Sequence, residues 1–422
     1  MLGSATGPQG GRQASAGNPL RPDPAPSPTA GARTVSAVIE KLYSLAASAE
    51  EPVEFGQMLL IGDAGRADAV LRDPALFQKQ YTVARLLGTS RFDSDGEGWE
   101  KRRSLTQPAY LKASRSSSRP EIAAAFEARL DAVAEPGPDA VRDALLSASA
   151  EIFHRAFGLE APGDAAVALF EGARPLLRKM QHVALFGTNA TDLGRLRTEA
   201  GRVRESFASW GGETQPFRRF ADSALTATDE IPDFDPLGEY LMNFFAGTET
   251  TAATMGWALD RLGTIGELQE RIHREVASGA GSSPLLEAFV NEVLRYFPPI
   301  PFLVRRATEA AVLGGISVRK EQTLIVSLIG LHHDPRYWES PRRFDPERRE
   351  FTGKSYNRRA FLPFSMGARV CGGASLARME AVEGLAAVIR GFRVTRAPGP
   401  TRFDFALALR PESSNLLTLE TR

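Results

Sequence analysis

Hydrophobic positions recur with helical spacing along most of the chain, and the pattern changes only in the last third. Between residues 97 and 297, apolar side chains return every three or four positions, with short Gly/Pro breaks, which predicts a series of helices. One stretch, residues 236–263, would span about 40 Å as a helix. Short apolar runs then predict strands, followed by one more helix over 374–392 and C-terminal strands.

The chain before residue 97 divides into two parts. Residues 1–34 hold six Pro, six Gly and no aromatic residue, so they bury too little apolar surface to offset the entropy of ordering. The pattern then predicts a helix over 36–47 and a strand over 52–62. We therefore expect a disordered tail over 1–34 and a single folded domain over 35–422, mainly α-helical with a small β region.

Composition and charge are those of an ordinary soluble protein. Hydrophobic residues make up 43% of the chain and charged residues 24%. The formal net charge is zero, so the total charge gives no support for a nucleic-acid partner or an anionic membrane surface. The tail has no apolar run that could serve as a signal peptide or membrane anchor. The single cysteine excludes a disulfide framework and fits a reducing cytoplasm.

That cysteine, Cys371, lies in the stretch "FSMGARVCGG", directly before the predicted helix over 374–392. A lone cysteine is often only a buried thiol, and this interpretation stays open from the residue alone. The neighbouring Gly367, Gly372 and Gly373 allow a tight turn and the close approach of a large flat group. The N-terminus of a helix favours a thiolate over a thiol.

The spacing Phe364-x-x-Gly367-x-Arg369-x-Cys371-x-Gly373 resembles the haem-ligand loop of the cytochrome P450 family at every position. The resemblance implies that the Cys371 thiolate is the proximal ligand of a haem b iron. It also implies that Phe364 packs beside the sulfur and that Arg369 pairs with a haem propionate. The expected fold is that of the family, with the haem between the long central helix and the helix after the Cys loop.

A second pattern, Glu292 and Arg295, places an acid and a base on one face of a predicted helix. The spacing alone is weak, because it also occurs in three pairs that we expect to lie on the surface: Glu100–Arg103, Glu171–Arg174 and Glu199–Arg202. The resemblance adds Arg348 from "FDPERR" and implies a buried ion network of the three residues. Its role would be structural.

The run "AGTETT", Ala246–Thr251, is a poor interior for a long helix because it contains Gly and β-branched Thr. It is either a tolerated weak spot or a local widening that opens a pocket. The resemblance places Ala246 beside the haem and oxygen over the same site. Thr250 would then hydrogen-bond the oxygen, and Glu249 would supply protons through water.

Two further matches concern the haem propionates. Trp99 and Arg103 lie one turn apart on a predicted helix, and without the other motifs a surface pair is equally compatible. The resemblance gives both to a propionate, together with Arg305, and Arg306 is the second choice for that position. The five histidines are scattered, and we expect them to be structural.

The resemblance implies a soluble, bacterial-type monooxygenase that uses O2 to hydroxylate or otherwise oxidise an apolar small molecule. No segment resembles a flavin or ferredoxin domain, so electrons would come from a separate ferredoxin and ferredoxin reductase, and we expect a monomer. Two alternatives remain: an electron-independent peroxygenase or isomerase, and a haem sensor without turnover. An acid–alcohol pair would serve neither alternative.

The substrate is not specified by the sequence, although bulky apolar residues suit a terpenoid, fatty acyl or polyketide skeleton. The expected pocket walls come from the long helix and from the segment after the Pro-rich break: Phe244, Phe245, Ile300, Phe302 and Leu303. Residues 341–378 carry nine Lys/Arg and three Asp/Glu, an excess of positive charge in a neutral chain. This basic segment is either a solvated face or a docking surface for an acidic ferredoxin.

Overall fold

The computed structural model describes residues 27–28, 33–45, 53–133, 138–160, 165–210, 231, 233–278, 283–412 and 417–422. Helices make up most of these residues, as the periodicity predicts. The longer helices are α1 (Arg33–Leu45), α2 (Ala64–Arg72), α3 (Gly96–Ala113), α4 (Arg119–Asp131), α5 (Pro138–Ala156), α6 (Ala165–Phe186), α7 (Ala190–Ser209), α9 (Pro236–Leu262), α10 (Gly266–Ala277), α11 (Pro284–Tyr296) and α14 (Ala374–Gly391). The short ones are η1 (Thr82–Leu87), η2 (Ser116–Ser118), α12 (Leu328–His332), α13 (Arg349–Thr352) and η5 (Gly367–Arg369).

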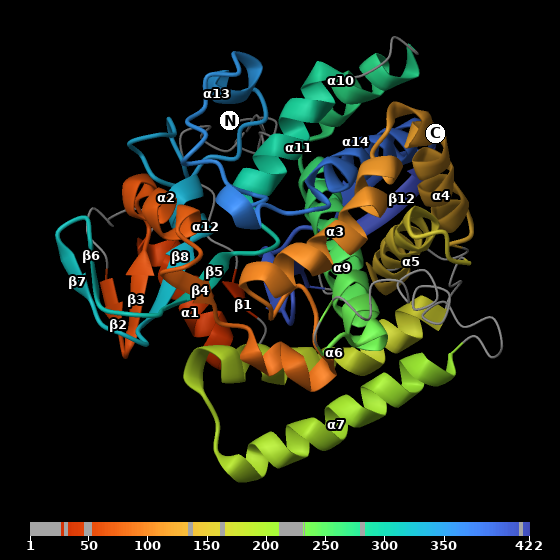
Figure 1. Cartoon of the computed structure of the whole chain (residues 1–422). Helices are drawn as coiled ribbons and strands as arrows, with labels where there is room; N and C mark the ends of the chain where they lie inside the picture. Colours follow the sequence, from red (N-terminus) through yellow and green to blue (C-terminus); the bar gives the residue numbers. More distant parts are fainter. Residues whose placement is uncertain are drawn as a thin grey trace, which may run out of the picture.

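Helix α9 forms the axis of the helical part, and α5 and α14 pack against it (Figure 1). The helix begins where the Asp235 side chain accepts a hydrogen bond from the Gly238 amide, and Pro236 occupies its first turn. It is buried nearly all round, which is typical of a helix inside a protein core. The prediction of one long central helix over 236–263 is confirmed to within one residue.

The main sheet of the β region has the order β2-β3-β8-β5-β4, formed by Val53–Phe55, Met58–Ile61, Thr323–Ser327, Phe302–Ala307 and Phe77–Lys79. The remaining strands are β1 (Ser27–Pro28), β6 (Ala311–Leu313), β7 (Ile316–Val318), β9 (Phe392–Arg396), β10 (Arg402–Phe405), β11 (Leu409–Pro411) and β12 (Leu417–Thr421). The main sheet and the β6–β7 hairpin lie on one side of the helices, whereas β12 lies among the helices near α14 and α4 (Figure 1). The single strand expected over 52–62 is wrong: the chain reverses at Gly56, whose φ of +61° suits a glycine, and forms the hairpin β2–β3.

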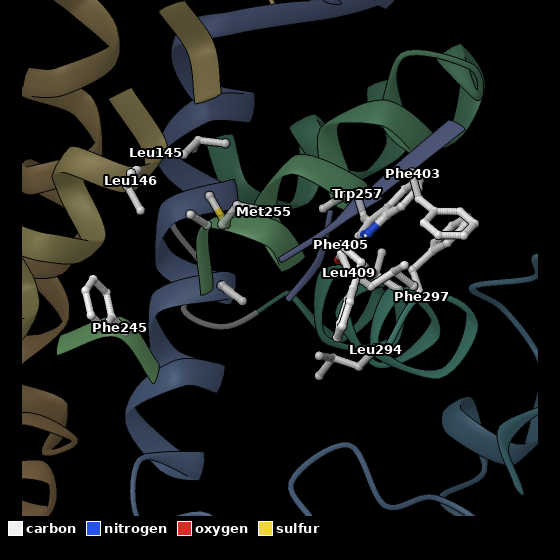
Figure 2. Close-up of a cluster of buried hydrophobic side chains, with 14 of the residues drawn as sticks. Leu145, Leu146, Phe245, Met255, Trp257, Leu294, Phe297, Phe403, Phe405 and Leu409 are labelled. Carbon is white, nitrogen blue, oxygen red and sulfur yellow. Dashed lines mark hydrogen bonds between the residues drawn. The ribbon is translucent and has the colours of Figure 1, made fainter. Parts of the chain in front are cut away.

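A continuous apolar core joins α9 to α5, α11 and the C-terminal strands (Figure 2). Trp257 stacks on Phe297 with 4.1 Å between ring centroids and 2° between ring planes. Its indole nitrogen donates a 2.9 Å hydrogen bond to the Leu409 carbonyl. The buried ring therefore satisfies its one donor while it ties α9 to α11 and to β11.

Two described elements begin before residue 35, the expected start of the folded domain. Ser27–Pro28 pair in parallel with β10, and α1 already begins at Arg33. These backbone hydrogen bonds do not depend on the apolar content from which the tail was predicted. The other residues of the expected tail, 1–26 and 29–32, lie outside the described residues. Within the described part of the chain, no helix combines the length and hydrophobicity required to cross a membrane.

Candidate active site

Cys371 lies in the loop between η5 and α14, and close backbone approaches on both sides define the loop. The Cys371 amide donates a 2.9 Å hydrogen bond to the Phe364 carbonyl. Gly367 has a φ of +71°, and a Cβ atom there would lie 2.6 Å from the Leu71 carbonyl oxygen. At Gly372 a Cβ atom would lie 2.6 Å from an Arg91 guanidinium nitrogen. The backbone conformation and the fixed Leu71 carbonyl both restrict position 367 to glycine, whereas a side chain at position 372 would require the ends of the Arg91 and Gln107 side chains to move.

The Cys371 side chain has free surface, although protein atoms crowd around it. This crowding desolvates the sulfur and raises the pKa of the thiol. A hydrogen bond from the Gly373 backbone, followed by the charges of Arg91 and Arg103, acts in the opposite direction. The loop thus presents an accessible sulfur to which the protein supplies donors and positive charge, as a metal-binding thiolate requires.

Positive side chains gather around Trp99 on α3. The Arg369 guanidinium lies 3.9 Å from the centroid of the Trp99 ring, and that of Arg103 lies 5.1 Å away. Arg103 donates a 2.6 Å hydrogen bond to the Ala368 carbonyl, and Arg369 pairs with Asp95. The structure therefore brings Trp99, Arg103 and Arg369 together beside the Cys loop.

Arg305 brings a further cation to this cluster from β5. Its side chain is 4% exposed and donates a 2.9 Å hydrogen bond to the Val304 carbonyl. Among the described residues, no carboxylate lies within ion-pair distance of it, and burial lowers the pKa of Arg305. Arg306, the second choice, instead points outward and pairs with Glu321.

The sequence interpretation missed two members of this cluster, Lys79 and Arg91. Lys79 lies directly opposite Arg305 in the antiparallel pair β4–β5, where like charges destabilise a sheet. Its ammonium group donates a 3.0 Å hydrogen bond to the Arg91 carbonyl. Burial and then the charges of Arg369, Arg305 and Arg91 lower the pKa of Lys79 to about 7. Spacing along the sequence could not predict that Lys79 belongs to this cluster, because the β4–β5 pairing joins two segments that lie far apart in the chain.

The three residues of the expected ion network lie together in the core. Both Glu292 oxygens accept hydrogen bonds from Arg295, at 2.7 and 2.9 Å, and from Arg348, at 2.8 and 3.0 Å. The Asp345 amide donates a further hydrogen bond of 2.7 Å to the same carboxylate. All three side chains are 5% exposed or less. The network fixes the segment that precedes the Cys loop against α11.

The "AGTETT" run does not interrupt α9, so the expected local widening of the helix is wrong. The hydroxyls of Thr248 and Thr250 instead donate to the carbonyls four residues before them, at 2.7 and 2.8 Å. Ala246 and Thr250 share one face of the helix, and both are half-buried, whereas most residues of α9 are buried. A stripe of α9 is therefore open at this point.

Glu249 points to another face of α9 and pairs with Arg174 of α6. The Arg174 guanidinium donates a 2.9 Å hydrogen bond to Glu249 Oε1 and two more, of 2.9 and 2.7 Å, to Glu171. Burial raises the pKa of Glu249, although Arg174 and then Arg410 oppose this. We expected Glu171–Arg174 to be a surface pair; this is wrong, because Arg174 is 7% exposed. Helical spacing shows that two residues can pair but not whether the pair is buried.

Tyr110 of α3 lies between the two motifs. Its ring lies against Gly373 after the cysteine, and its hydroxyl lies near Gly247 in the α9 run. The hydroxyl also donates a 3.0 Å hydrogen bond to Asn243 of α9. Two segments that lie far apart in the sequence thus share one neighbouring side chain.

The expected pocket wall is wrong for Phe244 and Phe245. Their side chains are 1% and 0% exposed and contact other aromatic rings, among them Phe207 and Phe170. They lie on the packed side of α9, where contacts with other rings bury nearly all of their apolar surface, so little of it is left to line a cavity. Phe302 is likewise buried, against Phe405, and only Ile300 and Leu303 are half-buried.

The histidines take part in packing and hydrogen bonds. His332, for example, faces the Arg295 carbonyl with one ring nitrogen and accepts the Leu362 amide with the other. In the described ranges, no group of three or more His, Cys, Asp or Glu side chains could hold a metal ion.

Comparisons with known proteins agree with this geometry. The model of the family described as Cytochrome P450 matches residues 203–418, slightly more than half of the chain. Cytochrome P450 4V2 of Mus musculus is 33% identical over 225 residues, which cover 49% of this chain and 43% of that protein. Cytochrome P450 2J3 of Rattus norvegicus is 38% identical over 163 residues, 35% of this chain and 32% of that protein. The matched region thus spans less than half of these relatives.

Solved structures show the same fold over nearly the whole chain. A cytochrome P450 from Thermus thermophilus has a TM-score of 0.69 at 22% identity, and the match covers 92% of this chain and 98% of that one. A zebra fish cytochrome P450 solved with progesterone has a TM-score of 0.72 at 20% identity, with 90% and 99% covered. With the match over residues 203–418, these findings show that the chain belongs to the cytochrome P450 family.

Proposed function

We propose that this protein is a haem-thiolate monooxygenase that transfers one oxygen atom of O2 to an apolar small molecule. The single observation that carries the proposal is the placement of an accessible cysteine sulfur beside a cluster of buried cations. Tyr110 links the Cys loop to the open stripe of α9, which carries the Thr250 hydroxyl, and Glu249 is the preceding residue, on another face of that helix.

The residues fit a haem b group, which has a flat ring, two carboxylates and an iron that takes a thiolate ligand. The sulfur of Cys371 would hold the iron. Lys79, Arg305 and Arg369 form a buried positive cluster, and among the described residues Asp95 is the one acid that forms an ion pair with it. Two carboxylates would remove the repulsion between Lys79 and Arg305, which face each other across β4–β5.

The bound haem would supply the activation of O2, and the chain would control the surroundings of that reaction. The Thr250 hydroxyl donates its proton to the Ala246 carbonyl, so its oxygen lone pairs remain available to accept a hydrogen bond from a protonated group in the open stripe. Burial raises the pKa of Glu249, one residue earlier, and so favours the protonated form that a proton donor requires.

The proposed substrate is an apolar small molecule, and the proposed electron donor is a separate protein. Ile300 and Leu303, which are half-buried after the Pro-rich break, remain proposed wall positions for an apolar substrate. Electrons would come from a separate ferredoxin. The single cysteine in 422 residues agrees with a reducing compartment and supports the proposed cytoplasmic location. A monomeric state is also part of the proposal.

The substitution Thr250→Ala tests the proposal. We expect haem content and the substrate-induced change of haem spin state to remain, while electrons are diverted from product to hydrogen peroxide. The quantity to measure is the ratio of product formed to NADPH consumed, with a surrogate ferredoxin system. An unchanged ratio would remove Thr250 from the reaction, and the absence of any NADPH-dependent product from the wild type, across a panel of apolar substrates, would favour a sensor.

A further inference from the structure

A cavity of about 50 Å³ lies on the face of α9 that carries Glu249, away from the open stripe at Thr250. Helices α5 and α6 and strands β11 and β12 enclose it. Most of its lining is apolar, from Val141, Leu145, Leu146, Ala252, Ala253, Gly256, Pro411 and Leu417. Its charged lining residues are Arg142, Arg174, Glu249, Arg410 and Glu412. The volume is several times smaller than that of pockets for organic ligands, which begin at roughly 300 Å³.

Three buried polar atoms of the lining have no hydrogen-bond partner among the described residues: Glu249 Oε2, Arg410 Nη1 and Glu412 Oε2. Glu249 is 2% exposed, and Arg174 occupies only its other oxygen. Arg410 Nη1 lies 3.8 Å from a Glu171 carboxylate oxygen, too far for a hydrogen bond. Buried polar groups without partners are rare in native proteins and indicate bound water or another ligand.

We infer that this cavity holds a small cluster of water that hydrogen-bonds to Glu249, Arg410 and Glu412 and carries protons from the protein surface to Glu249. A volume of about 50 Å³ accommodates roughly three to five water molecules. Such water needs two to four polar partners, and the three orphaned atoms supply them. The inference rests on the proposed function, because it names the route by which protons reach the acid of that reaction.

The entrance of this route lies at Glu412 and Arg142, two charged residues of the lining that are half-buried. A proton from solvent would pass to Glu412 and then along the water to Glu249 Oε2. Each water would accept one proton and release another, so one proton enters from solvent for each proton that Glu249 gives up. Arg174 is a positioning residue here, since it holds Glu249 Oε1 and leaves Oε2 facing the cavity.

The charged groups around Glu249 come from every element packed against that face. They are Arg174, Glu171 and Arg178 of α6, Arg142 of α5, Asp404 of β10, Arg410 of β11 and Glu412 after β11. Arg410 donates hydrogen bonds to Asp404, and Arg178 pairs with the same carboxylate. These groups bind one another, so among the described residues none donates a hydrogen bond to Glu249 Oε2, which faces the cavity.

The first test compares Glu412→Gln with Glu412→Asp. We expect Glu412→Gln to slow product formation about tenfold and to raise the solvent isotope effect, while Glu412→Asp restores both. The substrate-induced spin-state change of the haem should be equal in all three proteins. Glu420→Gln, at an exposed position on the neighbouring β12, is the matched control and should behave like the wild type.

The second test fills the cavity with Ala253→Leu, which should reproduce the effect of Glu412→Gln without a change of charge. Wild-type rates and isotope effects in Glu412→Gln would overturn the route whether or not Ala253→Leu folds. If Thr250→Ala still diverts electrons in that case, the proposed function stands and only the route fails. A high-resolution crystal structure gives an independent answer: ordered water on Glu249 Oε2 is expected, and a dry cavity would contradict the inference.

Discussion

The ion network at Glu292 and the cation cluster at Arg305 both bury arginine side chains, but the chain neutralises only the first. Glu292 accepts hydrogen bonds from two guanidinium groups and a backbone amide, so every lone pair that faces them is used. At Arg305 the neighbours are Lys79 and Arg369, and burial lowers the pKa values of all three. A satisfied cluster stabilises the fold, whereas an unsatisfied cluster indicates a group that the chain does not supply.

Substitution of Cys371 has the largest expected effect, because it removes the proposed iron ligand from the site that requires a bound group. In Cys371→Ala the cation cluster remains, but the sulfur that would hold the iron is absent. We expect complete loss of the thiolate-type spectrum of the reduced carbon-monoxide complex. A variant that kept this spectrum would show that another residue binds the iron, and the assignment of Cys371 would be wrong.

Glu292→Gln tests the satisfied cluster. The substitution leaves two buried guanidinium groups without their carboxylate, and we expect the free energy of unfolding to fall by about 3–5 kcal/mol. Chemical denaturation monitored by circular dichroism measures this loss. Glu347→Gln is the control, because it removes the exposed pair with Arg271 and should leave stability unchanged. Equal effects of the two substitutions would mean that burial of the network contributes nothing.

The unsatisfied cluster should respond in the opposite way. Arg305→Met removes repulsion in the haem-free protein and should stabilise it, while haem should dissociate about 10- to 100-fold faster, the effect of losing a charged hydrogen bond. Transfer of haem to an acceptor protein measures the rate. Arg306→Met, one residue further along β5 and paired with Glu321, is the matched control.

The dimethyl ester of haem separates charge from packing at this site. The ester keeps the flat ring but lacks both carboxylates, so Arg305→Met should bind it as tightly as the wild type does. If the substitution weakens binding of the ester to the same extent, Arg305 acts through packing and the proposed carboxylate contact is wrong.

The spacing of apolar residues and the short motifs were sufficient to predict the helices and the Cys loop. The helices were predictable because apolar residues recur at helical spacing between Gly and Pro breaks, and α9 and α14 follow their predicted ranges closely. The Cys loop was predictable because its motif includes Gly367, where the backbone conformation and the Leu71 carbonyl exclude any other residue. Two-residue turns are harder: only Gly56 and Gln57 separate the paired residues Phe55 and Met58 of the β2–β3 hairpin, so the segment resembles one strand.

Long-range electrostatics could not be predicted from the pattern. Lys79 looks like an ordinary surface lysine in the sequence, and only the β4–β5 register places it opposite Arg305. Arg174 likewise has an acid three residues before it, at Glu171, and would pass for a surface pair. Its burial depends on how α6 packs near α9, which no local spacing encodes.

Lys79 also gives the cluster a pH dependence. Its pKa is about 7 in the folded haem-free protein, while an unfolded chain has the ordinary value near 10.4. Between these values the unfolded state binds more protons, so the free energy of unfolding should rise with pH, by at most about 1.4 kcal/mol per pH unit. This contribution is present above the unfolded value and lost as the pH falls towards 7.

Denaturation of the wild type and of Lys79→Met from pH 7 to 10 measures the contribution by difference. The slope should be steeper in the wild type without haem, and the two proteins should become parallel once haem is bound, because carboxylates would restore the charge of Lys79. Parallel curves in the haem-free proteins would show that Lys79 is not held in the cluster.

The smallest expected effect concerns the basic segment 341–378, where the structure removes one of the charges we assigned to a docking surface. Arg378 donates a hydrogen bond to Asn291 and lies over the Phe364 ring, so it is not free to meet a partner. Arg358 and Arg359 are exposed, and the ion pair of Arg359 with Asp68 is long at 3.7 Å. These two arginines remain the best candidates for contact with an acidic ferredoxin.

Charge at such a surface accelerates encounter more than it deepens affinity, and salt screens it over about 8 Å at physiological ionic strength. We therefore expect Arg358→Glu with Arg359→Glu to slow reduction by an acidic ferredoxin severalfold at low salt, with the difference vanishing at high salt. Arg197→Glu with Arg202→Glu reverses two charges on α7, at the opposite end of the molecule from α13, and is the control (Figure 1). Stopped-flow measurement across a salt series decides the matter: equal rates for both double variants would leave the segment as a solvated basic face.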